Sequence, residues 1–421
     1  MNTDMEDLLF LVHRIPYPPN KGDKIRSFHL LEHLARRYRV HLGTFVDDPA
    51  DWRYVDAIRT LCGETYFAGL GSVWGRLKSF TSLWHDRALT VAYYRDAGLQ
   101  RWVDQLLQRF AIRRVLVFSS AMAQYVDGPA YRQLYRVIDF VDVDSDKWAQ
   151  YSRNRPWPLN WLYRRESRTL LNFERHVTAE FAASVFVTAA EAGLFRQLAP
   201  QAAAHVYHVG NGVDSGFFNP ALDYPNPYPP TATQVMVFTG AMDYWANADA
   251  VRWFAQEVFP LIQRHIPTAH FAIVGAHPTA AVRQLERLPG VQVVGAVRDI
   301  RPYLAHARLA VAPLRIARGV QNKVLEAMSM AKPVLLTPAA ADGLLPCPVL
   351  ESWIAAEPQS LADLAVRLLE EDDRSYAPLG RHWVLQHHDW PVHLDRFEQL
   401  LESELPPPVV TAKYDFAGGA S

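Results

Sequence analysis

The hydrophobic positions of the chain recur as short apolar runs, and the first of them is followed by a stretch with helical spacing. Leu8 to Val12 is apolar throughout, which predicts a buried strand, and Asp23 to Arg37 carries its apolar residues on one helical stripe. Val40 to Phe45 is the next apolar run. A strand, a helix and a strand in this order predict a βαβ unit and a parallel sheet. Further strands are expected at 114–118, at 136–140 and at 184–188, where the first half of the chain should end its sheet.

The same alternation restarts after Pro220 to Pro230, a proline-dense stretch without helical period that predicts an interdomain link. A helix is expected at 247–265, and the final apolar helix at 392–401. We therefore predict an α/β protein with two Rossmann-like, doubly wound parallel-sheet domains. The expected strands of the second half lie at 235–239, 269–274, 291–294 and 309–313. The predicted parts are a first domain at 1–219, a second at 220–385, a helix at 386–405 that packs back on the first domain, and a loose tail at 406–421.

The stretch Arg308 to Thr337 carries the most informative chemistry. It reads as an apolar strand, a basic loop with a glycine, an amphipathic helix and a second apolar strand. Lys323 falls in the first turn of that helix, and Glu326 lies three residues later on the same face. The N–H groups of a helix start and a lysine suit a diphosphate, and a carboxylate can accept two ribose hydroxyls. The alternative for this stretch alone is a solvated Lys–Glu pair on a surface helix.

Composition narrows the classes of function. The chain has 421 residues, a net charge of −1 and two cysteines, Cys62 and Cys347, far apart in the sequence. This balance favours no nucleic-acid partner, and the cysteines suggest neither a disulfide framework nor a zinc site. No apolar run approaches the length of a membrane span or a signal peptide. We expect a cytoplasmic protein without a metal site.

Two loops after predicted strands carry further candidates. The loop His13 to Lys24 contains Gly22, which would let a diphosphate approach the backbone at the next helix start. Its Lys21, Lys24 and Arg26 could contact phosphate or acceptor, or be solvated charges. After the predicted strand at 136–140, Asp142 or Asp144 could hold sugar or acceptor hydroxyls. The alternative for this acidic stretch is a turn and helix cap by Asp144 or Ser145, and it lacks the glycine and distal glutamate of a calcium loop.

The segment Trp148 to His176 is rich in Trp, Tyr and Arg. It predicts an amphipathic basic helix whose composition suits a peripheral contact with anionic lipid headgroups on the inner face of the membrane. An ordinary helix with a solvated basic face is the alternative.

Several motifs resemble those of GT-B glycosyltransferases, and among them glycosyltransferase family 4. These are HVGNGVD at His208 to Asp214, FTG at Phe238 to Gly240, and the stretch Arg318 to Ala327, which stands where that family has its paired-glutamate motif. The segments HRIPYPPNKGDKIRSFHLLEHLARR and DFVDVDSDKW also resemble the sugar transferases of PEP-CTERM/exosortase exopolysaccharide systems. The resemblance covers almost the whole chain and implies two domains with an interdomain cleft.

The resemblance also implies an activity. It is retaining, metal-independent transfer from a nucleotide-sugar co-substrate, with no other cofactor, to a glycan or lipid-linked acceptor. Two departures from the family leave open a catalytically degenerate subunit of a membrane glycan complex, because Arg318 replaces the usual first glutamate and Val141–Asp142 replaces a donor-contacting histidine. A sugar-nucleotide epimerase is a second alternative, since such enzymes share the two-domain GT-B fold.

The predicted site follows from these motifs. Asn247 is interpreted mainly as a helix N-cap. Gly240 would present backbone to phosphate, Gly275 and Asp299 would border the base, and the arginines would meet phosphate. The catalytic candidates are Lys323, Glu326 and Asp142, and the donor-binding candidates are Gly22, Gly240, Gly275, Asp299, Arg315, Arg318, Gly319, Val320, Gln321 and Asn322.

Overall fold

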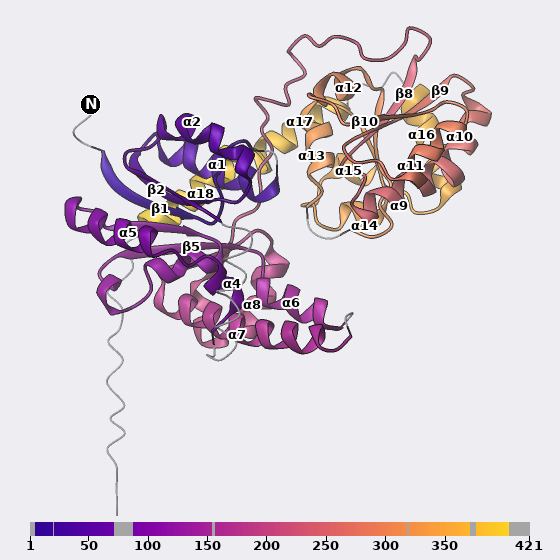
Figure 1. Cartoon of the computed structure of the whole chain (residues 1–421). Coiled ribbons are helices and arrows are strands. Elements are labelled where there is room, and N and C mark those ends of the chain that lie inside the picture. The colour runs from indigo at the N-terminus through magenta and orange to yellow at the C-terminus, as the bar shows by residue number, and fades with distance from the viewer. Residues whose placement is uncertain are drawn as a thin grey trace, which may run out of the picture. The chain divides into compact units, whose positions relative to one another are not determined.

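The computed structural model describes residues 5–19, 21–70, 87–153, 156–317, 320–370 and 376–403 (Figure 1). The chain divides into two compact units. Unit 1 comprises Met1–Val209 together with Leu394–Ser421, and unit 2 comprises Gly210–His393. This division falls ten residues before the expected boundary at 219/220, because the first sheet already ends at His208.

Unit 1 is built on a parallel sheet of seven strands in the order β3-β2-β1-β4-β5-β6-β7. The expected strands are present, but the expectation that the strand near 184–188 ends the sheet was wrong, because β7 follows it. The edge strands β3 and β7 escaped the sequence pattern, since β3 is mostly half-buried and β7 has three residues. The strands are β1 (Glu6–Val12), β2 (Tyr38–Val46), β3 (Thr65–Gly69), β4 (Arg114–Phe118), β5 (Tyr135–Val141), β6 (Ala183–Phe186) and β7 (Val206–His208).

Helices of unit 1 bury apolar stripes against this sheet, with Leu9, Leu11, Val115, Val117 and Ile138 in the core between them. Two helix starts are capped by side chains, as the sequence chemistry of such positions favours: Asp96 and Thr188 each accept a hydrogen bond from the first turn. The helices are α1 (Gly22–Leu34), α2 (Val55–Arg59), α4 (Leu89–Tyr93), α5 (Ala97–Arg109), α6 (Asp144–Arg153), α7 (Leu159–Glu180) and α8 (Ala189–Leu198).

Unit 2 holds a parallel sheet of five strands in the order β10-β9-β8-β11-β12. Counted from its own first strand this is 3-2-1-4-5, the doubly wound order that unit 1 also follows. The chain therefore reverses its direction of winding between β8 and β11, at the position where such sheets bind ligands. The strands are β8 (Gln234–Thr239), β9 (Ala269–Val274), β10 (Val291–Gly295), β11 (Leu309–Ala312) and β12 (Val334–Leu336).

The helix expected at 247–265 is interrupted. It consists of α9 (Trp245–Trp253), a π-helical turn at Phe254–Val258 and α10 (Phe259–His265). Pro260 lies at the start of α10, and because its ring nitrogen cannot donate and its ring crowds the preceding turn, the widened turn relieves this position. The remaining helices are α11 (Ala280–Arg283), α12 (Arg301–His306), α13 (Asn322–Ser329), α14 (Pro338–Ala341), α15 (Pro348–Glu351), α16 (Pro358–Glu370) and α17 (Tyr376–His387).

The last helix, α18 (Trp390–Glu402), begins in unit 2 and ends in unit 1. Its later turns contact unit 1: Glu398 lies 3.0 Å from the His33 ring, and Arg114 and Tyr135 donate to the carbonyls of Leu401 and Leu400. Among the described residues, every helix is too short or too polar to cross a membrane.

Candidate functional site

Two glycines meet where the strands β8 and β9 of unit 2 end. The N–H of Gly240 donates to the carbonyl of Val274, and the N–H of Gly275 donates to that of Gly295. A Cβ atom on Gly275 would lie 1.7 Å from the carbonyl oxygen of Gly240. Only a residue without a side chain fits here, so this glycine pair holds the two strand ends in close contact.

Lys323 lies directly beside this glycine loop. It is the second residue of α13, and its Nζ donates to Oδ1 of Asn247 at 2.5 Å and stands 4.4 Å from the centre of the Phe238 ring. A Cβ on Gly240 would lie 3.3 Å from that amine. The amine of Lys323 therefore lies at the start of α13, beside the point between β8 and β11 where the sheet reverses its winding.

Asn247 has a different role from the one expected of it. The interpretation as a helix cap was wrong, because α9 already begins at Trp245 and the side chain makes no capping bond there. Instead, Nδ2 donates to the carbonyl of Ala241 at 2.8 Å while Oδ1 accepts from Lys323. The amide therefore fixes both the glycine loop and the amine. Its distance from Lys323 in the sequence hid this contact.

Burial shifts the ionisation of the two principal candidates. Desolvation lowers the pKa of Lys323 to about 8, although Glu326 opposes the change. Desolvation also raises the pKa of Glu326 to about 7, against the effect of Lys323. Both residues keep part of their surface accessible while protein atoms surround their charged ends. Among the described residues, none donates a hydrogen bond to the Glu326 carboxylate, so its oxygens are available to a ligand.

Two other donor-site candidates are engaged in local pairs. Arg315 holds the half-buried carboxylate of Asp249, with Nη2–Oδ1 at 2.6 Å. Asp299 accepts the backbone N–H and the guanidinium of Arg301, and these bonds lower its pKa. Both arrangements are helix-surface pairs, in which a phosphate or a base would have to compete with an existing partner.

The loop before α13 completes the list of candidates in unit 2. Val320 precedes the helix, Gln321 occupies its N-cap position with extended backbone and no capping bond from its side chain, and Asn322 is the first helical residue. Arg318 and Gly319 lie outside the described residues.

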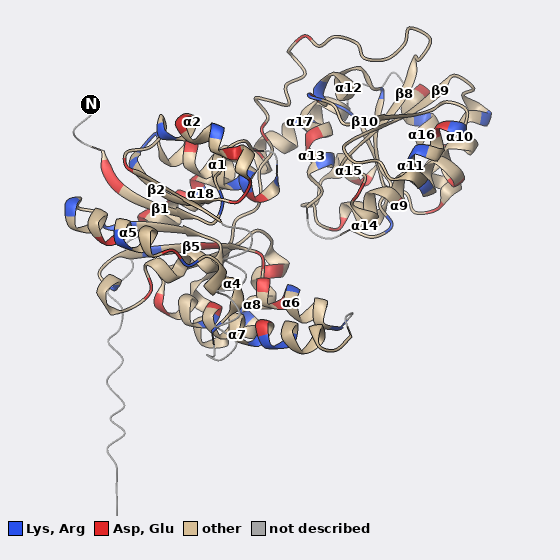
Figure 2. Cartoon of the chain, viewed as in Figure 1, with Lys and Arg blue, Asp and Glu red and all other residues tan. Residues whose placement is uncertain are grey.

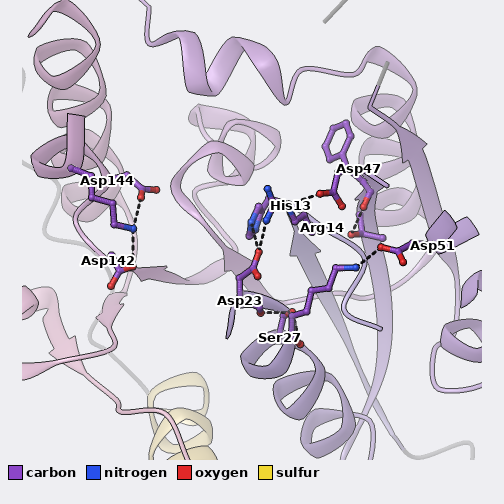
Figure 3. A network of polar contacts seen from close by, with 12 residues as sticks. His13, Arg14, Asp23, Ser27, Asp47, Asp51, Asp142 and Asp144 are labelled. Carbon is purple, nitrogen blue, oxygen red and sulfur yellow. Dashed lines mark hydrogen bonds and ion pairs between the residues drawn. The ribbon is translucent and has the colours of Figure 1, made fainter. Parts of the chain in front are cut away.

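In unit 1, the end of β1 and the start of α1 form a network of ion pairs (Figure 3). Gly22 opens α1 with no atom within 4 Å of a Cβ placed on it. The Asp23 carboxylate lies 3.0 Å from Nη1 of Arg14 and 3.3 Å from Nε2 of His13. Arg14 also contacts Asp47, which follows β2. The helix start is therefore lined by fixed charges of both signs.

Lys24 and Arg26 do not take either of the roles considered for them. Lys24 is 1% exposed and its Nζ lies 2.5 Å from Asp51, while Nε of Arg26 lies 2.6 Å from the buried carboxylate of Asp139. Neither is a solvated charge or an open phosphate contact. Such ion pairs offset the cost of desolvation and fix local geometry.

Asp142 follows Val141, whose φ of +71° is rare for a β-branched residue. Lys147 reaches back from α6, with Nζ 2.7 Å from Asp142 and 3.1 Å from Asp144. The hydroxyl of Ser145 donates to Glu174 at 2.5 Å instead of capping the helix. The strained strand end thus presents Asp142 next to a cation at the carboxyl edge of the sheet.

Residues 233–371 match the sequence model of the family "Glycosyl transferases group 1". Over the whole chain, the fold resembles solved structures of low sequence identity. Anabaena Alr3699/HepE in complex with UDP-glucose is 15% identical, with a TM-score of 0.60 over 94% of this chain and 99% of that chain. Sucrose-phosphate synthase from Thermosynechococcus elongatus is 17% identical, with a TM-score of 0.61 over 94% and 98%. A glycosyltransferase from Rickettsia africae is 11% identical, with a TM-score of 0.59 over 95% and 100%. The expected fold class is confirmed: the chain has the two Rossmann-like domains of GT-B glycosyltransferases.

Proposed function

We propose that this protein transfers a glycosyl group from a nucleotide-sugar to an acceptor hydroxyl. The observation that carries the proposal is the pairing of a buried amine, Lys323, with an unbonded carboxylate, Glu326, at the start of α13 beside the glycine loop. The helix start and the amine suit a diphosphate, and the carboxylate suits ribose hydroxyls. The family match over 233–371 supports the same chemistry, and HepE binds UDP and UDP-glucose.

The proposed reaction breaks the bond between the anomeric carbon and the diphosphate oxygen. The acceptor oxygen forms the new bond, and its proton passes to the departing diphosphate. Negative charge grows on the diphosphate, and protonated Lys323 together with the helix start would stabilise it. We propose retention of configuration and a metal-independent reaction from the family resemblance, with Lys323 supplying the positive charge that the departing diphosphate would need.

The acceptor side is proposed to lie in unit 1. Asp142 follows a strand of the first sheet and would bind sugar or acceptor hydroxyls, with Lys147 holding the carboxylate in place. The resemblance to exopolysaccharide sugar transferases suggests a glycan or lipid-linked acceptor in the cytoplasm. A lipid-linked acceptor would require the enzyme to work at a membrane surface.

The first test is binding of UDP, GDP, ADP and CDP, followed by their sugar conjugates, measured by thermal shift. A ligand that binds only the folded protein stabilises it by about 2.7 kcal/mol at a hundredfold excess over Kd. We expect one nucleotide to raise the unfolding temperature, and Glu326→Gln to abolish the rise. Glu370→Gln, an exposed change in the same unit, is the matched control and should respond as wild type.

The catalytic test adds acceptor extract and labelled nucleotide-sugar. Transfer by wild type and its loss in Lys323→Met and Glu326→Gln would support the proposal. Epimerised nucleotide-sugar in the absence of any acceptor would replace it with an epimerase. A folded protein that binds no nucleotide would instead be a degenerate GT-B subunit.

A further inference from the structure

Helices α6 and α7 of unit 1 form a hairpin that is anchored at one end. Ser145 and Glu174 join the two helices by a hydrogen bond, and Glu166 accepts the backbone N–H groups of Leu89 and Thr90 at 2.7 and 2.8 Å. The Ser145–Glu174 bond lies at the start of α6, and the Glu166 bonds hold α7 against the start of α4. In Figure 1 the two helices run side by side. The hairpin is therefore held by the rest of unit 1, and we call Tyr151–Arg153 together with residues 156–164 its tip.

Large apolar side chains gather on this tip. Trp157 is 80% exposed, Trp161 and Tyr151 are each 56% exposed, and Leu159 is 42% exposed. Single exposed apolar residues are ordinary, but four within eleven positions, 151 to 161, are an unusual local concentration. Tyr163 is different, because it packs on Trp148 with ring centres 5.1 Å apart. The exposed side chains thus stand on a packed support.

The charge of the tip has one sign. Residues 151–164 contain three arginines, Arg153, Arg155 and Arg164, and neither Asp nor Glu. Arg153 and Arg164 are exposed, and neither has an ion pair with a residue that the structure describes. The nearest carboxylate along the chain, Glu166, is buried and accepts the backbone N–H groups of Leu89 and Thr90. Figure 2 shows Lys and Arg along the outer part of α7.

We propose that this tip docks on the surface of an anionic lipid bilayer. Trp and Tyr favour the boundary between headgroups and acyl chains, where the ring is buried and the polar edge stays hydrated. Arginine binds lipid phosphate in a bidentate manner, and an anionic surface attracts a segment without carboxylates. Because α7 is charged along its length, the hairpin lies on the membrane and does not cross it.

The docking deepens the proposed function, since it would bring unit 1 to a lipid-linked acceptor, but it does not depend on transfer. Each arginine near an anionic surface strengthens partitioning about fivefold at low salt. The attraction weakens with salt, because the screening length falls from about 30 Å at 0.01 M to about 8 Å at 0.15 M. Replacing both arginines by Gln should therefore weaken binding on the order of twentyfold or more.

Flotation of the purified full chain with vesicles tests the inference. We expect the protein to float with vesicles of equal parts phosphatidylglycerol and phosphatidylcholine at low salt, and to stay behind with pure phosphatidylcholine. Trp157→Ala/Trp161→Ala should lose at least about tenfold in partitioning. The matched control is Trp52→Ala, since Trp52 is 46% exposed elsewhere in unit 1. It should float as wild type.

The charge contribution is tested in the same way with Arg153→Gln/Arg164→Gln. Its control, Arg101→Gln, removes an exposed arginine on α5 and should retain binding. Failure of wild type to float with anionic vesicles, or equal flotation of either double variant and wild type, would overturn the inference. Nucleotide thermal shifts without vesicles report the proposed function separately, and both tip variants should keep them.

Discussion

Replacing Lys323 by methionine should change how the stability of the protein depends on pH. The buried amine has its pKa lowered from 10.5 to about 8, so between these values the unfolded chain holds a proton that the folded chain has released. Stability then rises as pH rises through this window. The drop of about 2.5 pKa units corresponds to about 3 kcal/mol, and residual hydration of the amine reduces it toward about 2 kcal/mol.

The assay is the free energy of unfolding in urea at pH 7 and at pH 10, for wild type and for Lys323→Met. The methionine variant loses the bond to Asn247 at both pH values, so that cost cancels in the comparison. The remaining difference reports the cost of the buried charge. The free energy of unfolding of the variant minus that of wild type should be about 2 kcal/mol larger at pH 7 than at pH 10. The transition to follow is the one that belongs to unit 2.

Two controls isolate the amine. Removing Lys323 also removes a charge that favours ionisation of Glu326, so the comparison is repeated in a Glu326→Gln background. Lys147→Met is the opposite case. Burial lowers the pKa of Lys147, but the carboxylates of Asp144 and Asp142 raise it by more. Lys147 therefore keeps its proton in the folded protein, and its contribution to the free energy of unfolding should stay constant from pH 7 to pH 10. If the free energy of unfolding of wild type and of Lys323→Met changed in parallel with pH, the lowered pKa of Lys323 would be refuted.

The remaining predictions concern backbone space and ionisation. Gly275→Ala should lose several kcal/mol or fail to fold because its Cβ meets a backbone oxygen at 1.7 Å, whereas Gly22→Ala should gain up to about 1 kcal/mol, both measured by urea unfolding. Burial raises the pKa of Glu174 to about 8, so as pH rises from about 4.5 to 8 wild type should lose more stability than Glu174→Gln; equal slopes would contradict this. The pH profile of kcat/KM should peak between about 7 and 8, where Glu326 is ionised and Lys323 protonated. Lys323→Arg should move the alkaline limb upward, and an unchanged alkaline limb would count against the assignment to Lys323.

Most of the fold could be predicted because buried parallel strands have a strong sequence signal. Runs such as Leu8–Val12 and Leu309–Ala312 are apolar without interruption, since both faces of their sheets are covered. The strand Val206–His208 has no such run, because it lies at the edge of the sheet and is only partly buried. The turn at Phe254–Val258 kept the helical spacing of apolar residues, so the pattern could not reveal it.

The candidate site was only partly predictable, because sequence spacing reports one element at a time. Lys323 and Glu326 share a helix, so their grouping followed from the spacing. The bond between Asn247 and Lys323 joins residues 76 positions apart. The same holds for Arg26, whose partner Asp139 lies 113 positions away. A basic residue after a strand can contact either a ligand or a distant carboxylate. The neighbouring sequence is the same in both cases, so it cannot distinguish them.

The two units share one winding order but end their central strands differently, and this difference argues for different ligands. In unit 2 the strand ends carry Gly240 and Gly275, which expose backbone beside one cation, as binding a diphosphate requires. In unit 1 the equivalent edge carries Arg14, which already pairs with Asp47 and Asp23, and His13, whose ring also contacts Asp23. A diphosphate there would have to displace carboxylates, whereas neutral hydroxyls can add to such a network without breaking it.

We therefore expect nucleotide to bind through unit 2 and the hydroxyl-rich acceptor through unit 1. Nucleotide protection of backbone amides from hydrogen exchange confined to the ends of β8 and β9 and the start of α13 would fit this division. Protection centred on the start of α1 would reverse it.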